Sequence, residues 1–310
     1  MIFSRQGEVA KDFHVLGRPE YPIYLLDGER PVLFDGGLSH LGGTYASQAK
    51  AILGNRKPQF LFHTHLHYDH CGSSSFLRKC FPGLKIAASI QGAEIMARPR
   101  AVELMQAMND AARMADAGHE PVSAAEESFE PFTVDVLLAD GNRVDLGGGR
   151  SLVVYATPGH TRDFLSYYIP EAKILIASEA VGCAHAPGNV FVQFVSDYDQ
   201  YLASLERLVA LDVEVLCQGH FYVFTGKDVK DFLDSSVKAT TDYRKLIETL
   251  IAQEGGDAAR IVRRVKEIEW DVLTDPKLPE TAYLLNTEAR VKHLISRGER
   301  QKTVKMQSDF

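Results

Sequence analysis

Four histidines within eight consecutive residues restrict this chain more than any other feature of its sequence. His63, His65, His67 and His70 directly follow the apolar run 59–62, as a functional loop follows a buried strand. Eleven histidines in 310 residues would place about 0.3 in any window of eight (8 × 11/310), so the cluster requires a chemical reason. We expect a fold in which a strand ends at a site lined with imidazoles.

The histidine cluster has the composition of a metal site. Three imidazoles and one carboxylate fall within the six positions from His65 to His70. In an extended chain His65 and His67 point the same way, and a turn after them can bring Asp69 and His70 to a second point close by. Such a loop can supply two ions, and imidazole with carboxylate suits zinc, iron or manganese. The alternative, a group of exposed or hydrogen-bonded histidines without a metal, is disfavoured by this ligand pattern.

Three later segments each place a ligand type after an apolar run. His160 lies in a tight Thr-Pro-Gly-His loop, the run from Ile174 ends in Glu179, and the run from Val213 ends in His220. If these strand ends converge at one edge of a layered sheet structure, the ligands form two groups. We expect His65, His67 and His160 at one ion, Asp69, His70 and His220 at another, and Glu179 between them.

The remaining pattern predicts helices packed on largely antiparallel sheets. Turn-forming residues 27–30 separate two apolar runs, which is typical of a hairpin. Helices are expected at 73–80 and 197–210, and another is expected to end near residue 53. The expected strands are 24–26, 31–34, 59–62, 84–88, 131–138, 150–156, 164–169, 173–177 and 213–217.

Two helical segments stand apart from these strands. Residues 92–118 carry four of the six methionines, and the region after Gly226 has the periodicity of three helices. Those helices are expected at 227–254, 257–270 and 279–297, with Asp257 as an N-cap and Gly298 as a helix end. We therefore predict a domain at 1–225 that contains the insertion 92–118, a helical extension at 226–298 and a loose tail at 299–310.

We expect the insertion and the extension to cover the edge of the sheets that carries the metal ligands. Neither segment is needed to form the sheets, and each has an apolar side. Together they would form a closed apolar pocket for a small acyl group, lined by Met105, Met108, Phe221 and Tyr222. The alternative for the insertion is simple filling of the core. The alternative for the extension is pairing with a second copy of the chain in a homodimer.

Composition excludes several classes of partner. The formal net charge of −7 and the absence of a lysine and arginine cluster disfavour a nucleic-acid substrate. No apolar run approaches the roughly 18 residues that cross a membrane, and residues 1–11 lack the apolar stretch of a signal peptide. We therefore expect a cytoplasmic protein with a small-molecule substrate and no membrane partner. The four cysteines are scattered, which predicts neither a disulfide framework nor a cysteine zinc site.

The order of these motifs resembles the metallo-β-lactamase superfamily over residues 12–225. The matching features are HxHxDH at 65–70, TPGH at 157–160, a strand ending in a carboxylate, and GH at 219–220. The resemblance implies an α+β fold, a four-layer αβ/βα sandwich with a dinuclear metal site at the edge of its sheets. It also implies that Asp35 supports the ligands, and Thr161 and Asp163 are further candidates for that role. Within the superfamily, the stretch 68–72, the insertion and the helical C-terminal region are similar to the PqsE-type quorum-sensing thioesterases.

The chain departs from the family pattern at Ser178-Glu179, where most members have Gly-Asp. The extra methylene of Glu179 moves the carboxylate by about a bond length, which weakens the case for a bridge between two ions and for the second ion itself. Glu179 is still the expected ligand, because no other carboxylate ends that strand. Asp163, Ser178 and His185 are the alternatives nearby.

The chemistry that this resemblance implies is hydrolysis of a small ester or thioester, such as an acyl-CoA, by a metal-bound hydroxide. Asp69 would orient that hydroxide and carry its proton in addition to binding metal. Lactones and β-lactams are alternative substrates. A different class of function is a signalling regulator that retains the metal site but binds a ligand or a protein through its surface.

Overall fold

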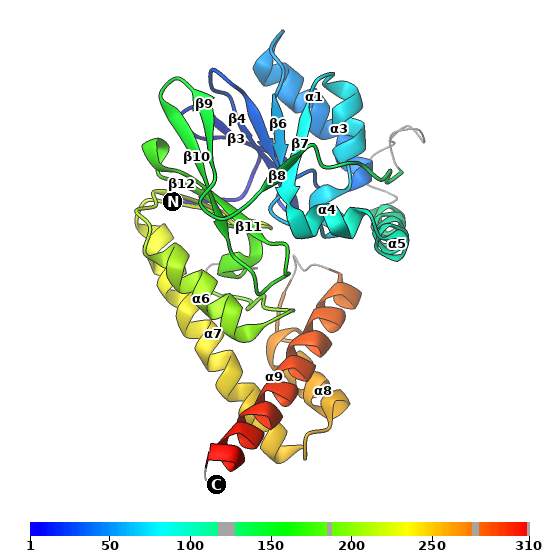
Figure 1. The fold of residues 1–310 in the computed structure, drawn as a ribbon, viewed down its shortest axis with the longest axis vertical. Coiled ribbons are helices and arrows are strands. Elements are labelled where there is room, and N and C mark those ends of the chain that lie inside the picture. The colour runs from blue at the N-terminus through cyan, green and yellow to red at the C-terminus, as the bar shows by residue number, and fades with distance from the viewer. Residues whose placement is uncertain (117–127, 185–187, 275–278, 309–310) are drawn as a thin grey trace. The chain divides into compact units, whose positions relative to one another are not determined.

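The structure, a computed structural model, describes residues 1–116, 128–184, 188–274 and 279–308 (Figure 1). The chain divides into two compact units. The first unit comprises Met1–Ala156, Asp163–Ser178 and Asp212–Lys230, and the second comprises Thr157–Arg162, Glu179–Leu211 and Asp231–Phe310.

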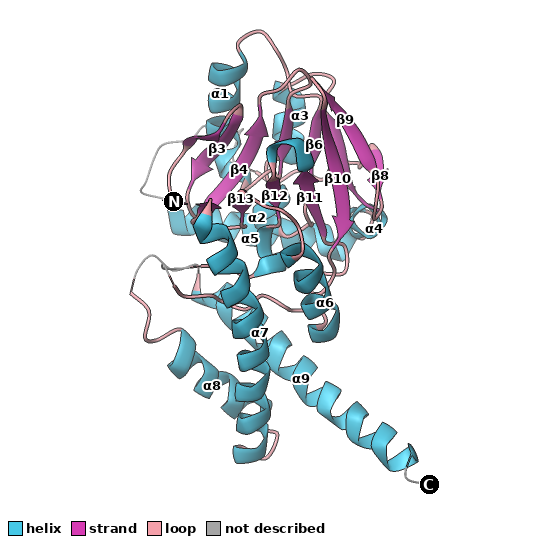
Figure 2. Ribbon diagram, turned by 90° about the vertical axis from the view of Figure 1, so that its left-hand side faces the viewer, coloured by secondary structure: helices cyan, strands magenta, loops and turns pink. Residues whose placement is uncertain are grey.

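The first unit contains two seven-stranded sheets, and all the strands of the described chain belong to it (Figure 2). One sheet has the order β1-β14-β13-β12-β11-β10-β9, and the other has the order β2-β3-β4-β5-β6-β7-β8. The strands are β1 Ile2–Phe3, β2 Gly7–Ala10, β3 Phe13–Arg18, β4 Tyr21–Leu26, β5 Val32–Phe34, β6 Phe60–Phe62, β7 Lys85–Ser89, β8 Val136–Leu138, β9 Arg143–Gly147, β10 Arg150–Ala156, β11 Leu165–Ile169, β12 Ile174–Ile176, β13 Val215–Cys217 and β14 Val223–Thr225.

Strand pairing is more mixed than the sequence predicted. The expected hairpin is present, because β4 and β5 pair antiparallel. However, β5, β6, β7 and β8 pair in parallel, and so do β12 and β13. Parallel neighbours need crossover connections, which here include a helix between β5 and β6 and another between β6 and β7. The prediction of largely antiparallel sheets is therefore wrong for this half of the β2–β8 sheet.

A shared apolar core joins the two sheets of the first unit. The rings of Phe34 on β5 and Phe62 on β6 stack with centroids 5.7 Å apart. Tyr167 on β11 of the other sheet lies 5.7 Å from the first ring and 5.5 Å from the second. Because these side chains pack closely, β6 is held as an interior strand of its sheet, between β5 and β7. The end of β6 is the start of the histidine cluster.

Helices of the first unit pack on the opposite side of the β2–β8 sheet around a second apolar cluster. They are α1 Gly42–Leu53, α2 Tyr68–Cys71, α3 Ser74–Cys80, α4 Ile90–Met96 and α5 Pro99–Asp116, with the short 3-10 helix η1 Ser39–Leu41. The predicted insertion helix is two helices, because Pro99 cannot continue a helix from α4 and instead begins α5. Met105 is buried in this cluster, whereas Met114 is 72% exposed. Residues 117–118 of the prediction lie outside the described residues.

Helices make up the regular structure of the second unit. They are α6 Tyr198–Val209, α8 Ala258–Glu269 and α9 Glu280–Ser308, together with most of α7 Lys227–Gln253, and the 3-10 helix η3 Ser178–Val181 precedes them. Asp257 caps α8 as predicted, accepting a hydrogen bond from the amide of Arg260. The predicted end at Gly298 is wrong, because α9 passes through it. Gly298 has no positive φ, so it does not adopt the left-handed conformation that terminates helices.

Two further findings concern the chain as a whole. Across the described ranges, no helix is both long enough and apolar enough to span a bilayer. The four cysteines are free thiols, and three of them are buried: Cys71, Cys183 and Cys217.

Candidate metal centre

The histidine loop begins where β6 ends. The amide of His63 donates to the carbonyl of Ala87, and the amide of Asp35 donates to the carbonyl of Phe62, both at 2.9 Å. Helix α2 starts at Tyr68, five residues later. The sheet therefore fixes the first residue of the loop, and α2 fixes its end.

Asp69, His70 and His220 come together in the first unit, as the sequence predicted for one group of ligands. One ligand atom from each lies within 4.8 Å of those of the other two. The Nε2 atom of His220 is 3.7 Å from Oδ2 of Asp69, and the rings of His70 and His220 have centroids 5.4 Å apart. Both imidazoles are buried, and Asp69 is half-buried. His220 follows β13, so the sheets bring together residues 150 positions apart in the chain.

His65 and His67 also face one another in the first unit. Their ring centroids are 4.5 Å apart, and the ring of His65 lies 4.3 Å from that of His70. Phe164 stacks on His65 at 4.6 Å. The carboxylate of Asp163 accepts the amide of Leu66 at 2.9 Å, which fixes the backbone between the two histidines. Asp163 thus supports the loop through its backbone.

Hydrogen bonds at Nδ1 fix two of the imidazoles. Nδ1 of His220 lies 2.6 Å from the backbone carbonyl of Glu20, and Nδ1 of His70 lies 3.0 Å from Oδ2 of Asp35. A carbonyl can only accept, so Nδ1 of His220 carries the proton and Nε2 presents a lone pair. The same holds for His70 beside the Asp35 carboxylate. This tautomer is the one that binds metal ions through Nε2.

Asp35 is the central support of the loop. It is 3% exposed, and its Oδ1 accepts the amide of Thr64 at 2.8 Å. Burial raises the pKa of this carboxyl group, but the nearby imidazole of His63 and the hydrogen-bonded imidazole of His70 more than offset that effect and lower the pKa below its ordinary value. Asp35 therefore contacts and orients His70, one of the residues predicted as a ligand. The hydroxyl of Thr161, the other candidate, has no hydrogen-bond partner within the described residues.

No role at the site was predicted for the two tyrosines next to this group. The ring of Tyr21 meets that of His220 edge-on, with centroids 5.9 Å apart. Burial, and then the charge of Asp69, raise the pKa of both Tyr21 and Tyr68. Both phenols therefore stay protonated at neutral pH. Tyr21 opens a strand remote in sequence, and nothing in its local pattern marks it as part of a site.

His160 belongs to the second unit, where the chain holds it tightly. Gly159 has φ +133°, and a Cβ atom built on it would lie 2.3 Å from the backbone of Tyr201, so the Pro-Gly-His turn requires glycine. The hydroxyl of Ser204 on α6 donates to the carbonyl of Pro158 at 2.8 Å. Nδ1 of His160 donates to the backbone carbonyl of Gln193. This imidazole therefore has the same tautomer as His220.

Glu179, also in the second unit, does not lie at a strand end as predicted. β12 ends at Ile176, and Glu179 follows in η3, where it is 3% exposed. Ser178, the residue before it, has φ +48°, which turns the chain sharply after the strand. The hydroxyl of Tyr201 donates to the backbone carbonyl of Glu179 at 3.1 Å. His185, one of the alternatives, lies outside the described residues.

The family model described as the metallo-beta-lactamase superfamily matches residues 18–220, more than half of the chain. The chain belongs to the metallo-β-lactamase superfamily. All seven residues predicted as ligands fall within the matched range.

Solved structures show the superfamily fold in this chain. A metallo-β-lactamase family protein from Thermus thermophilus aligns with a TM-score of 0.64 at 20% identity, over 95% of each chain. A superfamily protein from the archaeon Sulfolobus tokodaii aligns with a TM-score of 0.57 at 16% identity, over 91% of this chain and 97% of that chain. The predicted α+β metallo-β-lactamase fold is therefore confirmed.

Two superfamily relatives match part of the sequence. The human acyl-coenzyme A thioesterase MBLAC2 is 27% identical over 175 residues, which are 54% of this chain and 58% of that protein. The hydroxyacylglutathione hydrolase of Bartonella tribocorum is 35% identical over 102 residues, which are 32% of this chain and 37% of that protein. Each match spans less than two thirds of the relative's length.

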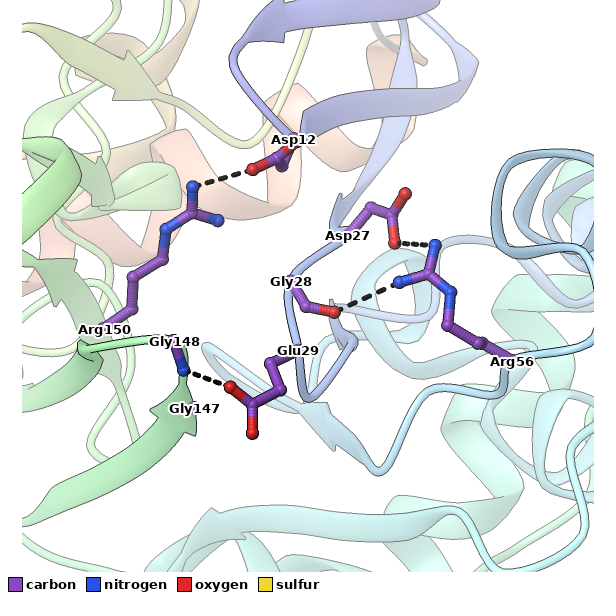
Figure 3. Close-up of a pocket in the computed structure, with 8 residues that line it drawn as sticks. All are labelled: Asp12, Asp27, Gly28, Glu29, Arg56, Gly147, Gly148 and Arg150. Atoms are coloured by element: carbon purple, nitrogen blue, oxygen red, sulfur yellow. Dashed lines mark hydrogen bonds and ion pairs between the residues drawn. The ribbon is translucent and has the colours of Figure 1, made fainter.

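A polar pocket is lined by residues at the ends of the strands opposite to the histidine cluster (Figure 3). It includes Asp27, which follows β4, whereas Tyr21 at the start of the same strand lies beside His220. Its two arginines are each paired with an aspartate of the lining, and Glu29 accepts the amide of Gly148 at 2.7 Å. Arg150 bonds Asp12 at 2.7 Å, and Arg56 contacts Asp27 at 2.6 Å. Ion pairs therefore connect the turns around this pocket, and we do not assign it as a second metal site.

Proposed function

We propose that this chain is a metal-dependent hydrolase of small esters or thioesters, including acyl-CoA-like compounds. The observation that carries the proposal is the group of Asp69, His70 and His220, whose ligand atoms lie within 4.8 Å of one another. Such a set of nitrogen and oxygen donors fits zinc, iron or manganese. The Nδ1 hydrogen bonds of both imidazoles fit as well, because they direct the lone pair to Nε2.

The proposed ligand set includes the remaining residues expected from the sequence. His65, His67 and His160 would bind one ion, and Glu179 would contribute a carboxylate to both. The 4.5 Å separation of the rings of His65 and His67 supports the first group, as does the backbone hydrogen bond that fixes the tautomer of His160. The proposed cofactor is thus two divalent ions, of which the second is the weaker because of the length of Glu179.

The residues of the first unit have defined parts in the proposed hydrolysis. A bound divalent ion acidifies water and polarises the substrate carbonyl. The Asp69 carboxylate, half-buried beside His220, is placed to orient a water molecule and to accept its proton. The protonated phenols of Tyr21 and Tyr68 lie near this carboxylate without competing for the proton. Asp69 is therefore proposed as both a ligand and the catalytic base.

The two relatives support a thioester as the substrate class. Both are named for hydrolysing acyl conjugates of a thiol, coenzyme A in one and glutathione in the other. The similarity of residues 68–72 to PqsE-type thioesterases agrees with this choice. Lactones and β-lactams are the alternatives within hydrolysis, and a ligand-binding or protein-binding regulator is the alternative outside it.

A hydrolysis panel tests the proposal. The protein is purified without chelators, its metal content is measured, and it is assayed with acyl-CoA, acyl-glutathione, an aryl ester, a lactone and a chromogenic cephalosporin. His70→Ala, which removes a proposed ligand, serves as the matched control. We expect thioester turnover that the control lacks. Turnover of the cephalosporin alone would replace the substrate class, and no turnover above buffer by metal-loaded protein would favour the regulator.

The helical extension is proposed to cover the site, with residues 1–225 as the hydrolase domain. The alternative, pairing of two copies through 226–298, predicts a different mass in solution. Light scattering separates them, since a monomer favours the cover and a homodimer favours the pairing.

A further inference from the structure

A buried arginine of helix α9 is connected to the proposed ligand His160 through two consecutive residues. Arg290, 2% exposed, donates from Nη1 to the backbone carbonyl of Val192 at 2.6 Å. The next carbonyl, that of Gln193, accepts the hydrogen bond from Nδ1 of His160. All four residues belong to the second unit.

We infer that Arg290 is a positioning residue for His160. The inference rests on the proposed function, because it takes His160 as a metal ligand. It assigns to the helical extension a part in shaping the ligand set, which is distinct from covering the site.

The residues around Arg290 hold its guanidinium in a single position. Nη2 donates to Oγ1 of Thr287 at 2.7 Å and lies 3.7 Å from the carboxylate of Glu269. The ring of Tyr243 on α7 packs on the guanidinium at 4.7 Å. A buried cation held by hydrogen bonds, a carboxylate and an aromatic face cannot shift without losing several contacts at once. The carbonyl of Val192 is therefore fixed from the α9 side.

The other end of the segment 192–197 is held by the turn that carries His160. The amides of Val195, Ser196 and Asp197 all donate to the carbonyl of Gly159, at 3.0 to 3.1 Å. The segment 192–197 is thus anchored by Arg290 at one end and by the backbone next to His160 at the other. Gln193 lies between these anchors, so the direction of its carbonyl depends on both.

That carbonyl determines how His160 presents itself to a metal ion. Accepting from Nδ1–H fixes the tautomer and the ring plane, and loss of such a partner typically costs about 10- to 100-fold in metal affinity. Without Arg290 the carbonyl of Val192 loses its guanidinium donor, and we expect the next carbonyl, that of Gln193, to align less well with the imidazole. The expected consequence is weaker metal binding at His160 with the ligands themselves intact.

Co²⁺ affinity of the metal-free full-length protein tests the inference. We expect Arg290→Met to weaken binding about 10-fold or more, and Arg290→Lys, which keeps one donor for Val192, to recover part of the loss. Thr287→Val is the matched control, because it removes a hydrogen bond of Arg290 but not the one to Val192. Since Arg290→Met leaves Glu269 buried without its cation, the pair Arg290→Met with Glu269→Gln provides a second variant that removes both charges.

A spectroscopic readout separates positioning from general destabilisation. In the metal-free protein, ¹⁵N NMR of the histidine side chains, assigned by the loss of a signal in His160→Ala, should show the Nδ1–H form in wild type and in Thr287→Val. A mixture of tautomers is expected in Arg290→Met. Wild-type Co²⁺ affinity and an unchanged tautomer in both Arg290→Met variants would overturn the inference alone. Unchanged affinity in His160→Ala would instead remove His160 from the proposed ligand set, and the inference with it.

Discussion

Nδ1 of His70 lies 3.0 Å from Oδ2 of Asp35, and the other oxygen of the same buried carboxylate accepts the amide of Thr64. One side chain thus orients a proposed ligand and holds the backbone of the loop that carries two more. Burial by itself would raise the pKa of Asp35, but the imidazoles of His63 and His70 lower it below its ordinary value. The carboxylate therefore helps to position the proposed ligands, and it can do so without binding the ion itself.

The first prediction concerns this support. Asp35→Asn keeps one acceptor oxygen, so either His70 or Thr64 would face an amide NH₂ group instead. We expect metal affinity to fall about 10- to 100-fold, measured by competition with a chromogenic chelator. Asp12→Asn makes the same chemical change in the polar pocket at the far end of the strands and should leave affinity unchanged. Equal affinity in the two variants would contradict the role given to Asp35.

The second prediction separates the ligands from their supports. His65→Ala or His67→Ala removes a proposed nitrogen ligand, and each variant should bind about one ion fewer than wild type and lose hydrolysis. Metal content is measured by elemental analysis after gel filtration. Full metal content together with wild-type turnover in either variant would refute the assignment of that residue.

A third prediction addresses Asp69. Asp69→Asn retains the size of the side chain and one oxygen but loses the charge and the capacity to accept a proton. At saturating metal, kcat should fall by about 10²-fold or more while KM changes much less. Steady-state kinetics at several metal concentrations provides the measurement. A change confined to KM would show that Asp69 has no part in the chemical step.

Glu179 provides the fourth prediction, since it departs from the aspartate of most superfamily members. If its longer side chain is adapted to this site, Glu179→Asp should change the occupancy of the second ion or the turnover. Elemental analysis and the hydrolysis assay report the two effects separately. A variant indistinguishable from wild type in both would mark Glu179 as a bystander.

The ligand pattern was open to prediction because it depends on local sequence. His65, His67, Asp69 and His70 are near neighbours in the chain, so an extended segment followed by a turn brings them together whatever surrounds it. His220 could be added because it follows the apolar run from Val213, in the GH motif that matches the superfamily order. Where a motif is local or lies at a strand end, the sequence already contains most of the geometry.

The backbone partners of His160 and His220 were not open to prediction in the same way. The partners of His160 and His220 are the backbone carbonyls of Gln193 and Glu20, and every residue has a carbonyl, so side-chain identity gives no signal. The helix end predicted at Gly298 was wrong because residue type alone does not determine backbone conformation. A glycine permits a left-handed helix end but does not require one, and α9 continues through Gly298.

The last prediction concerns the anchoring of helix α5 and its dependence on pH. Asp116 at the end of this helix accepts hydrogen bonds from the guanidinium of Arg18 and, at 2.8 Å, from Nε2 of His40. Burial raises the pKa of this carboxyl group, but the bonds to Arg18 and His40 outweigh it and lower the pKa below the ordinary value. The unfolded chain therefore binds the proton more tightly than the folded one. The stabilisation is complete above the unfolded pKa of about 3.9 and is lost as pH falls through the folded pKa.

Asp116→Asn should accordingly lower the free energy of unfolding at pH 7 by about 1 kcal/mol, a modest value because the group is partly exposed. The difference from wild type should shrink as pH falls below about 4. Urea unfolding followed by circular dichroism at a series of pH values measures it, with Asp110→Asn on the same helix as the control. A difference that stays constant from pH 7 into acid would mean that the carboxylate charge does not anchor α5, and that Asp116 acts only through its shape.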